Sequence, residues 1–364
     1  MMKLSDVCTK GTSNIAQKDL DARNGTYPIY GASGFIKNVD FYHQEKPYIA
    51  IVKDGAGVGR VMQLPAKSSV IGTMQYIIPN EGVSVEYLAY ALEHMNLSKY
   101  YLGAAIPHIY FKDYCSETLP NHTPEEQAHI SHVLGLVSNL IFLRKQQLSK
   151  LDEIVRSRFI EMFENGNFPL VKAEDVCEFI TKGTTPPTGE IYTEFGDNRI
   201  PYLKVYNLSF DGSLLFDCAP QYIDKSVHNG KLSRSKVYPN DVLMNIVGPP
   251  LGKFSLVTSE FAEWNINQAI SIFRAKNNVL PRFLLSALMQ PTVLEPFLKQ
   301  AVGVRQLNIS LEQCRNIQFP LPPIELQDEF VAFAEQTDNS KLTIQKSLEK
   351  LETLKKALMQ QYFG

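Results

Sequence analysis

Two long stretches of the chain place apolar residues at alternating spacings of about three and four, the seam of a coiled-coil helix. The first seam is Val137, Ile141, Leu148, Leu151, Val155 and Met162, and the second is Ile344, Leu348, Leu351, Leu354, Leu358 and Tyr362. The first helix is predicted to begin at the capping box Thr123-Pro124-Glu125-Glu126 and to run to about Glu164, before Asn165-Gly166. The second follows Pro322-Pro323. About 40 residues make each helix about 60 Å long.

Such a narrow seam needs a partner, and the nearest one is the equivalent helix of the other half. Antiparallel pairing would carry the remaining segments to opposite ends of a rod. Arg144 and Arg158 interrupt the first seam. The alternative is that each helix packs on its own domain.

The other segments are rich in predicted strands, with short apolar runs ended by Gly, Pro, Asn and Asp. Examples are residues 48–52, 75–78 and 241–247. A shorter amphipathic helix is predicted near residues 85–99, with Leu88, Ala91, Leu92 and Met95 on one face. Its counterpart begins at Pro281, and Pro291 should break it.

The two halves of the chain repeat one another. At a constant offset of 200, Gly103, Ile109, Pro120, Glu125, Gln127, Leu148, Leu151 and Phe163 match Gly303, Ile309, Pro320, Glu325, Gln327, Leu348, Leu351 and Phe363. Upstream the offset shortens: Leu88 matches Leu284, Arg60 matches Lys253, Gln75 matches Gln268, Lys10 matches Lys182, and Cys8 matches Cys177. A collinear series of this kind indicates internal duplication. The predicted fold is α/β (α+β), with an internal pseudo-twofold repeat. Its segments are 1–120 and 166–320, each followed by a long helix, 121–165 and 321–364.

Composition indicates an ordinary soluble protein, with 44% hydrophobic and 20% charged residues. No apolar run approaches the ~18 residues of a membrane span, and the N-terminus lacks signal-peptide features. Five scattered cysteines without a Cys-x-x-Cys pair favour reduced thiols in the cytoplasm. Cys8 and Cys177 are expected to be small core residues. The net charge of −2 does not suggest a nucleic-acid binder, so DNA binding would need local basic loops or help from partner subunits.

Several motifs together resemble the specificity subunit of Type I restriction-modification systems, along essentially the whole chain. They are Ile180-Thr181-Lys182-Gly183-Thr184-Thr185-Pro186-Pro187, Ile200-Pro201-Tyr202-Leu203-Lys204, Asn265-Ile266-Asn267-Gln268-Ala269-Ile270 and the joint from Phe319 to Gln327. The first half departs from the pattern, because its joint reads Leu119-Pro120-Asn121-His122-Thr123-Pro124 and its opening lacks paired prolines.

The resemblance implies two target-recognition domains (1–120 and 166–320) and two helices that form an antiparallel coiled coil. Each domain would read one half of a split DNA target, and the coiled coil would set the gap. The implied partners are double-stranded DNA, two modification subunits that methylate adenine at N6, and restriction subunits that translocate and cleave DNA, with no membrane. S-adenosylmethionine, ATP and magnesium would be bound by those subunits, and no cofactor by this chain.

No catalytic chemistry is predicted within the chain itself. Gly55-Ala56-Gly57-Val58-Gly59-Arg60 has its third glycine too early for a dinucleotide loop, and Gly248-Pro249-Pro250-Leu251 lacks the flanking residues of a methyltransferase loop. Both are predicted to be turns, and no Walker loop is present. His129 and His132, with His122 before them, are predicted to lie on a solvated helix face, because no fourth metal ligand is found. No catalytic, cofactor-binding or metal-binding residue is therefore expected.

Candidate DNA contacts are the Lys, Arg, Asn, Gln and Thr residues of the loops, since these types bond base edges and phosphates. They are Lys10, Thr12, Arg60, Gln75, Lys182, Thr184, Arg234, Lys236, Lys253, Asn265, Asn267, Gln268, Arg305 and Gln306. The competing hypotheses are a coiled-coil scaffold with two ligand- or protein-binding heads, which the flat charge balance favours, and a standalone enzyme, which the missing cofactor motifs disfavour.

Overall fold

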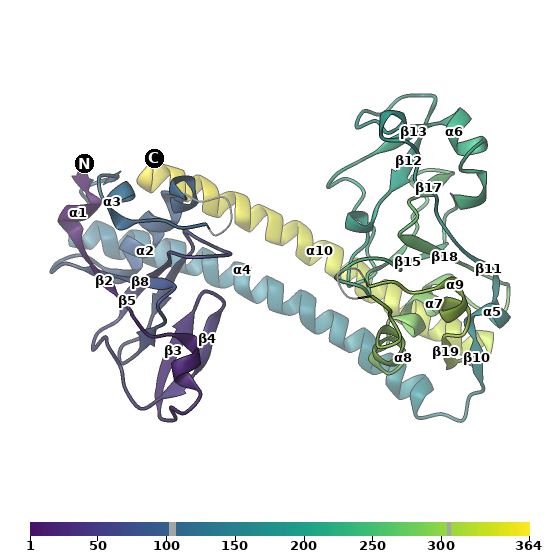
Figure 1. Ribbon diagram of the computed structural model, residues 1–364, viewed down its shortest axis with the longest axis horizontal. Helices are drawn as coiled ribbons and strands as arrows, with labels where there is room; N and C mark the ends of the chain where they lie inside the picture. Colours follow the sequence, from purple (N-terminus) through teal and green to yellow (C-terminus); the bar gives the residue numbers. More distant parts are fainter. Residues whose placement is uncertain (102–106, 304–306) are drawn as a thin grey trace. The chain divides into compact units, whose positions relative to one another are not determined.

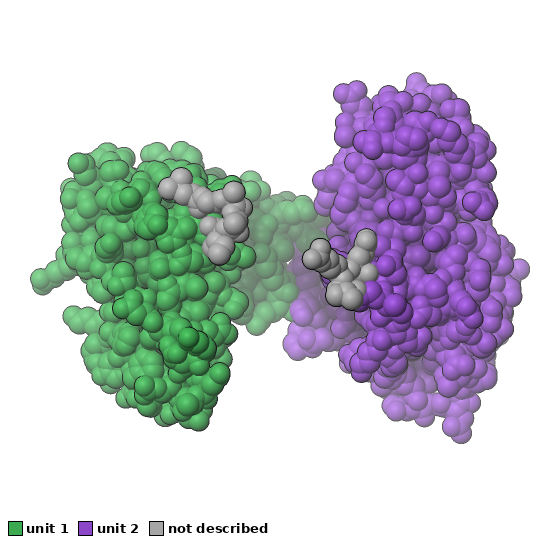
Figure 2. Space-filling view, viewed as in Figure 1, with its two compact units in different colours: residues 1–146, 345–364 green, residues 147–344 purple. Residues whose placement is uncertain are grey.

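The computed structural model describes residues 1–101, 107–303 and 307–364 of the chain. It divides into two compact units (Figure 2), one made of residues 1–146 and 345–364, the other of residues 147–344. Both long helices contribute to both units, because the division falls within each of them. No helix in these described ranges is long and apolar enough to cross a membrane.

The long helices are α4 (Pro124–Phe159), which continues into a single π turn over Ile160–Glu164, and α10 (Ile324–Phe363). The predicted capping box is present at the start of α4. The amide of Thr123 donates to Glu126 Oε2 at 2.8 Å, and the amide of Glu126 donates to Thr123 Oγ1 at 3.2 Å. These reciprocal bonds satisfy two otherwise unpaired donors, which is why the helix begins where the sequence predicted.

The helices α4 and α10 run antiparallel (Figure 1), and ion pairs join them in each unit. The first unit has Lys145–Glu352 at 2.9 Å, and the second has Asp152–Lys341 and Arg158–Glu329, the latter at 2.9 Å. The partner number falls along α10 as the number rises along α4, so the predicted antiparallel pairing is confirmed. One seam residue was predicted wrongly: Leu354 is 46% exposed, whereas Met359, which was not assigned to the seam, is buried.

The first unit is built on a four-stranded antiparallel sheet in the order β2-β8-β5-β6. Its strands are β2 (Cys8–Thr12), β8 (Met74–Pro79), β5 (Tyr48–Val52) and β6 (Val61–Leu64). Successive side chains of a strand point to opposite faces of the sheet, so alternate residues of β5 belong to different clusters. Ile49 and Ile51 pack with α2 (Val85–His94) and the beginning of α4, whereas Ala50 and Val52 face a second cluster on the other side.

A smaller sheet completes the strand-rich part of the first unit. In it, β3 (Tyr27–Gly31) pairs antiparallel with β4 (Gly34–Val39) and parallel with β7 (Ser69–Val70). The remaining elements are short: β1 (Met2–Lys3), α1 (Leu4–Val7), α3 (Phe111–Tyr114), β9 (Thr118–Leu119) and single 3-10 turns at Gln17–Leu20 and Leu97–Tyr100.

The second unit repeats this topology, with one additional strand in its smaller sheet. Its main sheet has the order β11-β18-β15-β16, and β12 again pairs antiparallel with one strand, β13, and parallel with another, β17. The main-sheet strands are β11 (Cys177–Lys182), β18 (Ile270–Ala275), β15 (Val242–Asn245) and β16 (Phe254–Leu256). The smaller sheet contains β12 (Arg199–Leu203), β13 (Tyr222–Asp224), β17 (Trp264–Ile266) and the additional β14 (Lys236–Val237). The duplication predicted from the sequence is therefore confirmed.

Two consecutive helices of the second unit each begin at a proline, and the first of them packs on the main sheet. α7 (Pro281–Leu288) begins at one proline, and α8 (Pro291–Leu298) begins at the next. Pro291 thus ends the first helix, as predicted, but it also supplies the first turn of another. The other elements are β10 (Leu170–Lys172), α5 (Ala173–Val176), α6 (Lys225–Asn229), α9 (Leu311–Arg315), β19 (Gln318–Pro320) and 3-10 turns at Thr188–Glu190, Val205–Asn207 and Ser233–Ser235.

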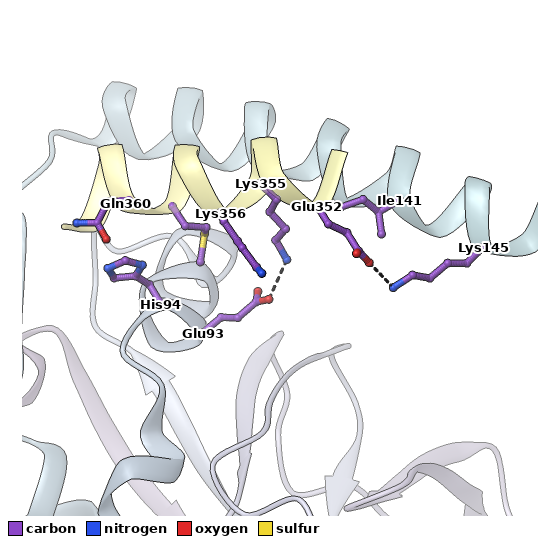
Figure 3. A pocket seen from close by; sticks show the side chains of 9 residues that line it. Glu93, His94, Ile141, Lys145, Glu352, Lys355, Lys356 and Gln360 are labelled. Atoms are coloured by element: carbon purple, nitrogen blue, oxygen red, sulfur yellow. Dashed lines mark hydrogen bonds and ion pairs between the residues drawn. The ribbon is translucent and has the colours of Figure 1, made fainter. Parts of the chain in front are cut away.

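In the first unit, the end of α10 is tied to α2 across a groove of about 690 Å³ (Figure 3). Lys355 Nζ lies 2.8 Å from Glu93 Oε1, and Lys145 of α4 pairs with Glu352. Met359, which also lines the groove, and Phe363 are buried in the core of this unit. The last turns of the chain are therefore part of the first unit, although they are distant from it in sequence.

Candidate nucleic-acid interface

A groove of about 660 Å³ in the second unit collects polar side chains at one end of the main sheet. We call it the Lys182 groove. It is lined by Lys182, Gly183, Thr184, Val247, Asn267, Gln268, Ala269 and Asn308. Lys182 ends β11, residues 267–269 form the turn between β17 and β18, and Val247 follows β15. Four residues predicted from the sequence to contact DNA, Lys182, Thr184, Asn267 and Gln268, therefore lie together.

In the Lys182 groove, the backbone at Gly183 packs closely against the backbone of residues 266–270. Gly183 donates its amide to Ile270 at 3.1 Å. A Cβ on Gly183 would lie 2.2 Å from the carbonyl oxygens of Ile266 and Asn267, so only glycine fits there. The amide of Ala269 donates to Asn267 Oδ1 at 3.2 Å, which leaves the exposed Gln268 side chain at the tip of the turn. The sequence thus presents Lys182 and Gln268 on a rigid support.

Two residues predicted to contact DNA are instead part of the core, which corrects the sequence-based list. Asn265 is fully buried, and its carboxamide bonds Ser235 Oγ at 2.9 Å and His228 Nδ1 at 3.0 Å. Gln75 is 4% exposed and donates to the hydroxyl of Tyr114. Enclosed amides with bonded partners present no donor or acceptor to a base edge.

The strand register also corrects the proposed equivalence of Gln75 and Gln268. Lys10 lies opposite Ile77, and its repeat partner Lys182 lies opposite Ser271. This register places Ala269, and not Gln268, at the position of Gln75. The two glutamines therefore have different environments, one in the core and one at the rim of a groove.

Three further candidates of the second unit, Arg234, Lys236 and Lys253, lie outside the lining of the Lys182 groove. Arg234 is exposed on a 3-10 turn. Lys236 Nζ donates to Asn229 Oδ1 at 2.6 Å and lies 3.5 Å from Glu263. Lys253 Nζ lies 5.7 Å from the ring centroid of Phe210. Arg305 and Gln306 fall outside the described residues.

In the first unit, the candidates Lys10 and Thr12 are exposed on β2. Arg60 is exposed as well, and its guanidinium donates to the carbonyl of Ala32 at 2.9 Å. The glycine-rich segment before Arg60 is the turn between β5 and β6, and the Gly248 segment is the turn between β15 and β16, as predicted. Neither turn precedes a helix.

Sequence reasoning missed a charged cluster in the first unit. Lys53 Nζ lies 2.9 Å from Asp54 Oδ2, and His108 Nδ1 bonds the other carboxylate oxygen of Asp54. Burial alone would raise the pKa of Asp54, but bonds from Lys53 and His108 outweigh it and hold that pKa below its usual value. No local sequence signal points to this cluster, because Asp54 and His108 are 54 residues apart.

The side chains that could have indicated other chemistry have ordinary roles. Cys8 and Cys177 are buried, and burial raises the pKa of each thiol to about 12, so both are core residues, as predicted. His129 and His132 are exposed on α4, as predicted. No cluster of His, Cys, Asp and Glu able to hold a metal ion occurs among the described residues.

The duplicated strand-rich units and the paired helices have counterparts in known proteins. The family model for the Type I restriction modification DNA specificity domain matches residues 1–153 and 165–356. The chain belongs to this family. It is similar to the specificity subunit of the Type I restriction enzyme MjaVIII of Methanocaldococcus jannaschii, with 24% identity over 349 residues, 90% of this chain and 81% of that protein. The EcoBI specificity subunit of Escherichia coli is 28% identical over 137 residues, 36% of this chain and 28% of that one.

Solved structures from Type I restriction-modification systems share the fold. The S subunit of a Type I restriction-modification system from M. genitalium matches with a TM-score of 0.57 and 15% identity, over 100% of this chain and 95% of that one. A chain from a structural study of complex assembly in the Type I system matches with a TM-score of 0.51 and 16% identity, over 99% and 96%. As a specificity subunit, this protein is the non-catalytic, DNA-recognising part of a Type I system. Its partners are DNA and other subunits of that system.

Proposed function

We propose that this specificity subunit reads a bipartite DNA target, one half through residues 1–120 and the other through residues 166–320. The observation that supports this is the duplicated topology, in which β2-β8-β5-β6 and β11-β18-β15-β16 carry different side chains on one framework. Two copies of one fold with different surfaces suit two different short sequences. In the second half, Lys182, Thr184, Asn267 and Gln268 of the Lys182 groove would supply phosphate and base contacts.

The two long helices, residues 121–165 and 321–364, would set the gap between the half-sites. Their ion pairs in both units resist sliding of one helix along the other, because sliding would separate the charges. A fixed register gives a fixed gap, and the helices would then act as a ruler.

The modification chemistry would belong to partner subunits in the cytoplasm. Two modification subunits would bind S-adenosylmethionine and methylate adenine N6 in each half-site, and restriction subunits would use ATP and magnesium to translocate and cleave DNA. An apolar stripe on α4 suits such a partner. Leu136, Leu140 and Leu143 follow at helical spacing and are 53%, 45% and 43% exposed. A contiguous exposed apolar stripe indicates an interaction site.

The test is methylome sequencing of cells that express this chain with its modification subunit, compared with cells that lack this chain. We expect a split motif with methyladenine in each half, lost on deletion. Replacing residues 1–120 with the same segment of another specificity subunit should change one half only. If the methylome stays the same without the chain while its partners are expressed, the proposed function is wrong. If the exchange changes both halves, the assignment of one half to each segment is wrong.

A further inference from the structure

The two units differ in chemistry at one equivalent backbone position. In the second unit, Val247 and Asn308 form an isolated β-bridge at the Lys182 groove, and Gly248 donates to Leu307 at 3.0 Å. The first unit has the same bridge between Asp54 and His108, and Gly55 donates to Pro107 at 2.9 Å. The backbone is conserved between the repeats, but an apolar residue and an amide are replaced by a carboxylate and an imidazole.

His108 is held in one orientation by Asp54. The bond between Asp54 and Nδ1 assigns the proton of a neutral ring to Nδ1, so Nε2 remains as an acceptor. Within the described ranges, Nε2 is buried and has no hydrogen-bond partner. A buried unpaired polar atom is unfavourable, so stability of the fold does not explain the histidine at this position.

The ring of Tyr110 lies next to His108, and Lys112 lies next to Tyr110. The ring centroids of His108 and Tyr110 are 4.0 Å apart, and Lys112 Nζ lies 5.2 Å from the centroid of Tyr110. Tyr110 is 49% exposed, and Lys112 is exposed on α3. We call His108, Tyr110 and Lys112 the His108 strip.

The second unit lacks this strip. At the constant offset of 200 between the repeats, its residues are Asn308, Ser310 and Glu312. Ser310 caps α9 by accepting from the amide of Gln313, whereas Tyr110 makes no side-chain cap to α3. Glu312 carries the charge opposite to that of Lys112. The tyrosine and lysine are therefore not needed by the fold at this position.

We propose that the His108 strip is a DNA-contacting, specificity-determining surface of the first recognition segment that the second segment does not have. The proposal rests on the proposed function above and adds the residues that carry it. Lys112 contacts a phosphate and Tyr110 packs its ring against the sugar-base edge, while His108, whose Nε2 atom is buried, supports the Tyr110 ring. Asp54 is a positioning residue, because it orients His108 without contacting DNA.

The second repeat supplies substitutions that this framework already accepts: His108→Asn, Tyr110→Ser and Lys112→Glu. The matched control is Lys46→Glu, which makes the same charge change at an exposed lysine. Lys46 precedes β5, whereas Asp54 follows it. The full chain, assembled with its modification subunits, is titrated with a duplex that carries the methylated motif, from 50 to 200 mM salt.

Lys112→Glu should weaken binding roughly tenfold at 0.1 M salt and make the negative slope of log K against log salt shallower by about 0.9, the effect of one lost phosphate contact. Tyr110→Ser should weaken binding without changing the slope. His108→Asn should relax the methylated motif at one position of the half assigned to residues 1–120, and leave the other half unchanged.

The proposal is overturned if Lys112→Glu and Tyr110→Ser bind like the Lys46→Glu control, or if His108→Asn leaves the first half-site unchanged, while wild type binds its motif. If wild type itself binds no split motif, the proposed function fails instead. If Lys112→Glu does not assemble, Lys112→Gln replaces it, with the same expected loss of slope.

Discussion

At the scale of single residues, the buried polar network around His228 makes the second unit sensitive to acid. His228 is fully buried between Asn265 and Glu263, and burial together with nearby Lys236 lowers its pKa below the usual 6.5, although Glu263 opposes this. An unfolded chain then binds the proton more readily than the folded one. The stabilisation is fully present above about pH 6.5 and is lost as the pH falls through the lowered pKa.

His228 is the only histidine between residues 147 and 344, and Trp264 is the only tryptophan of the chain. Trp264 is buried in the same unit, so its fluorescence reports unfolding there. We expect the free energy of unfolding in urea to fall between pH 7.5 and pH 5 in wild type, and to fall less in His228→Gln. Equal pH dependence in both proteins would show that another group is responsible.

The ion pair of Arg274 and Asp241 is a second residue-scale feature of this unit. Asp241 is buried, and Arg274 bonds both of its carboxylate oxygens, at 2.8 and 2.6 Å. The guanidinium carbon of Arg274 lies 4.4 Å from the ring centroid of Phe179 and 4.7 Å from that of Tyr238. Arg274→Met leaves the carboxylate buried without its cation, with only the amide of Tyr238 donating to it, and we expect the free energy of unfolding to fall by about 3–5 kcal/mol.

The measurement is again urea unfolding followed by Trp264 fluorescence. Lys231→Ala is the control, because Lys231 pairs with Glu190 at the surface, and such pairs contribute only about 0–1 kcal/mol. An equally small effect of Arg274→Met would mean that Asp241 is solvated or protonated when its partner is removed.

Residue type alone could not separate DNA contacts from core amides. Asn265 and Asn267 are two positions apart, yet one completes the His228 network and the other lines the Lys182 groove. The difference depends on β14 and α6, which approach Asn265 from distant parts of the sequence. The Asp54–His108 bond was not predictable for the same reason, since it is created by strand pairing and not by a local motif.

At the scale of elements, a repeated glutamine explains how each long helix is joined to its unit. Gln127 Oε1 accepts from the amide of Ser84, the N-cap residue of α2, and Gln327 Oε1 accepts from Leu280, the N-cap residue of α7. Gln327 Nε2 also donates to Pro322 at 2.9 Å. Both side chains are buried. The pair matched in the sequence at an offset of 200 is thus a structural clamp.

Removing this clamp should destabilise the second unit. Gln327→Ala leaves a buried amide and a buried carbonyl without partners, and we expect a loss of about 1–3 kcal/mol in urea unfolding. Gln336→Ala, at an exposed position of the same helix, should change stability by less than about 0.5 kcal/mol. A similar small change for both variants would show that water replaces the clamp.

The elements that the sequence predicted well are those with local signals. The capping box at Thr123, the prolines at 281 and 291 and the apolar seams determined the helices without knowledge of the rest of the fold. The parallel pairing of β3 with β7 carries no such signal, because it joins residues about forty positions apart. Its recurrence as β12 with β17 became visible only in the structure.

At the scale of the whole molecule, the paired helices predict a change in DNA spacing. We would insert seven residues into both α4 and α10, after Gln146 and after Ile344, where the two units divide. Seven residues preserve the heptad phase and add about 10.5 Å at 1.5 Å per residue. At about 3.4 Å per base pair, the gap in the methylated motif should grow by about three base pairs, with both half-sites unchanged.

The insertion in α4 alone is the control that separates a ruler from a passive linker. It adds two helical turns between Lys145 and Arg158 of α4, while the distance between their partners Glu352 and Glu329 on α10 stays the same. The ion pairs of the two units can therefore no longer form together. We therefore expect the single insertion to abolish methylation, measured by sequencing, while the double insertion retains it with a longer gap. An unchanged gap after the double insertion would mean that the modification subunits, and not these helices, determine the distance between half-sites.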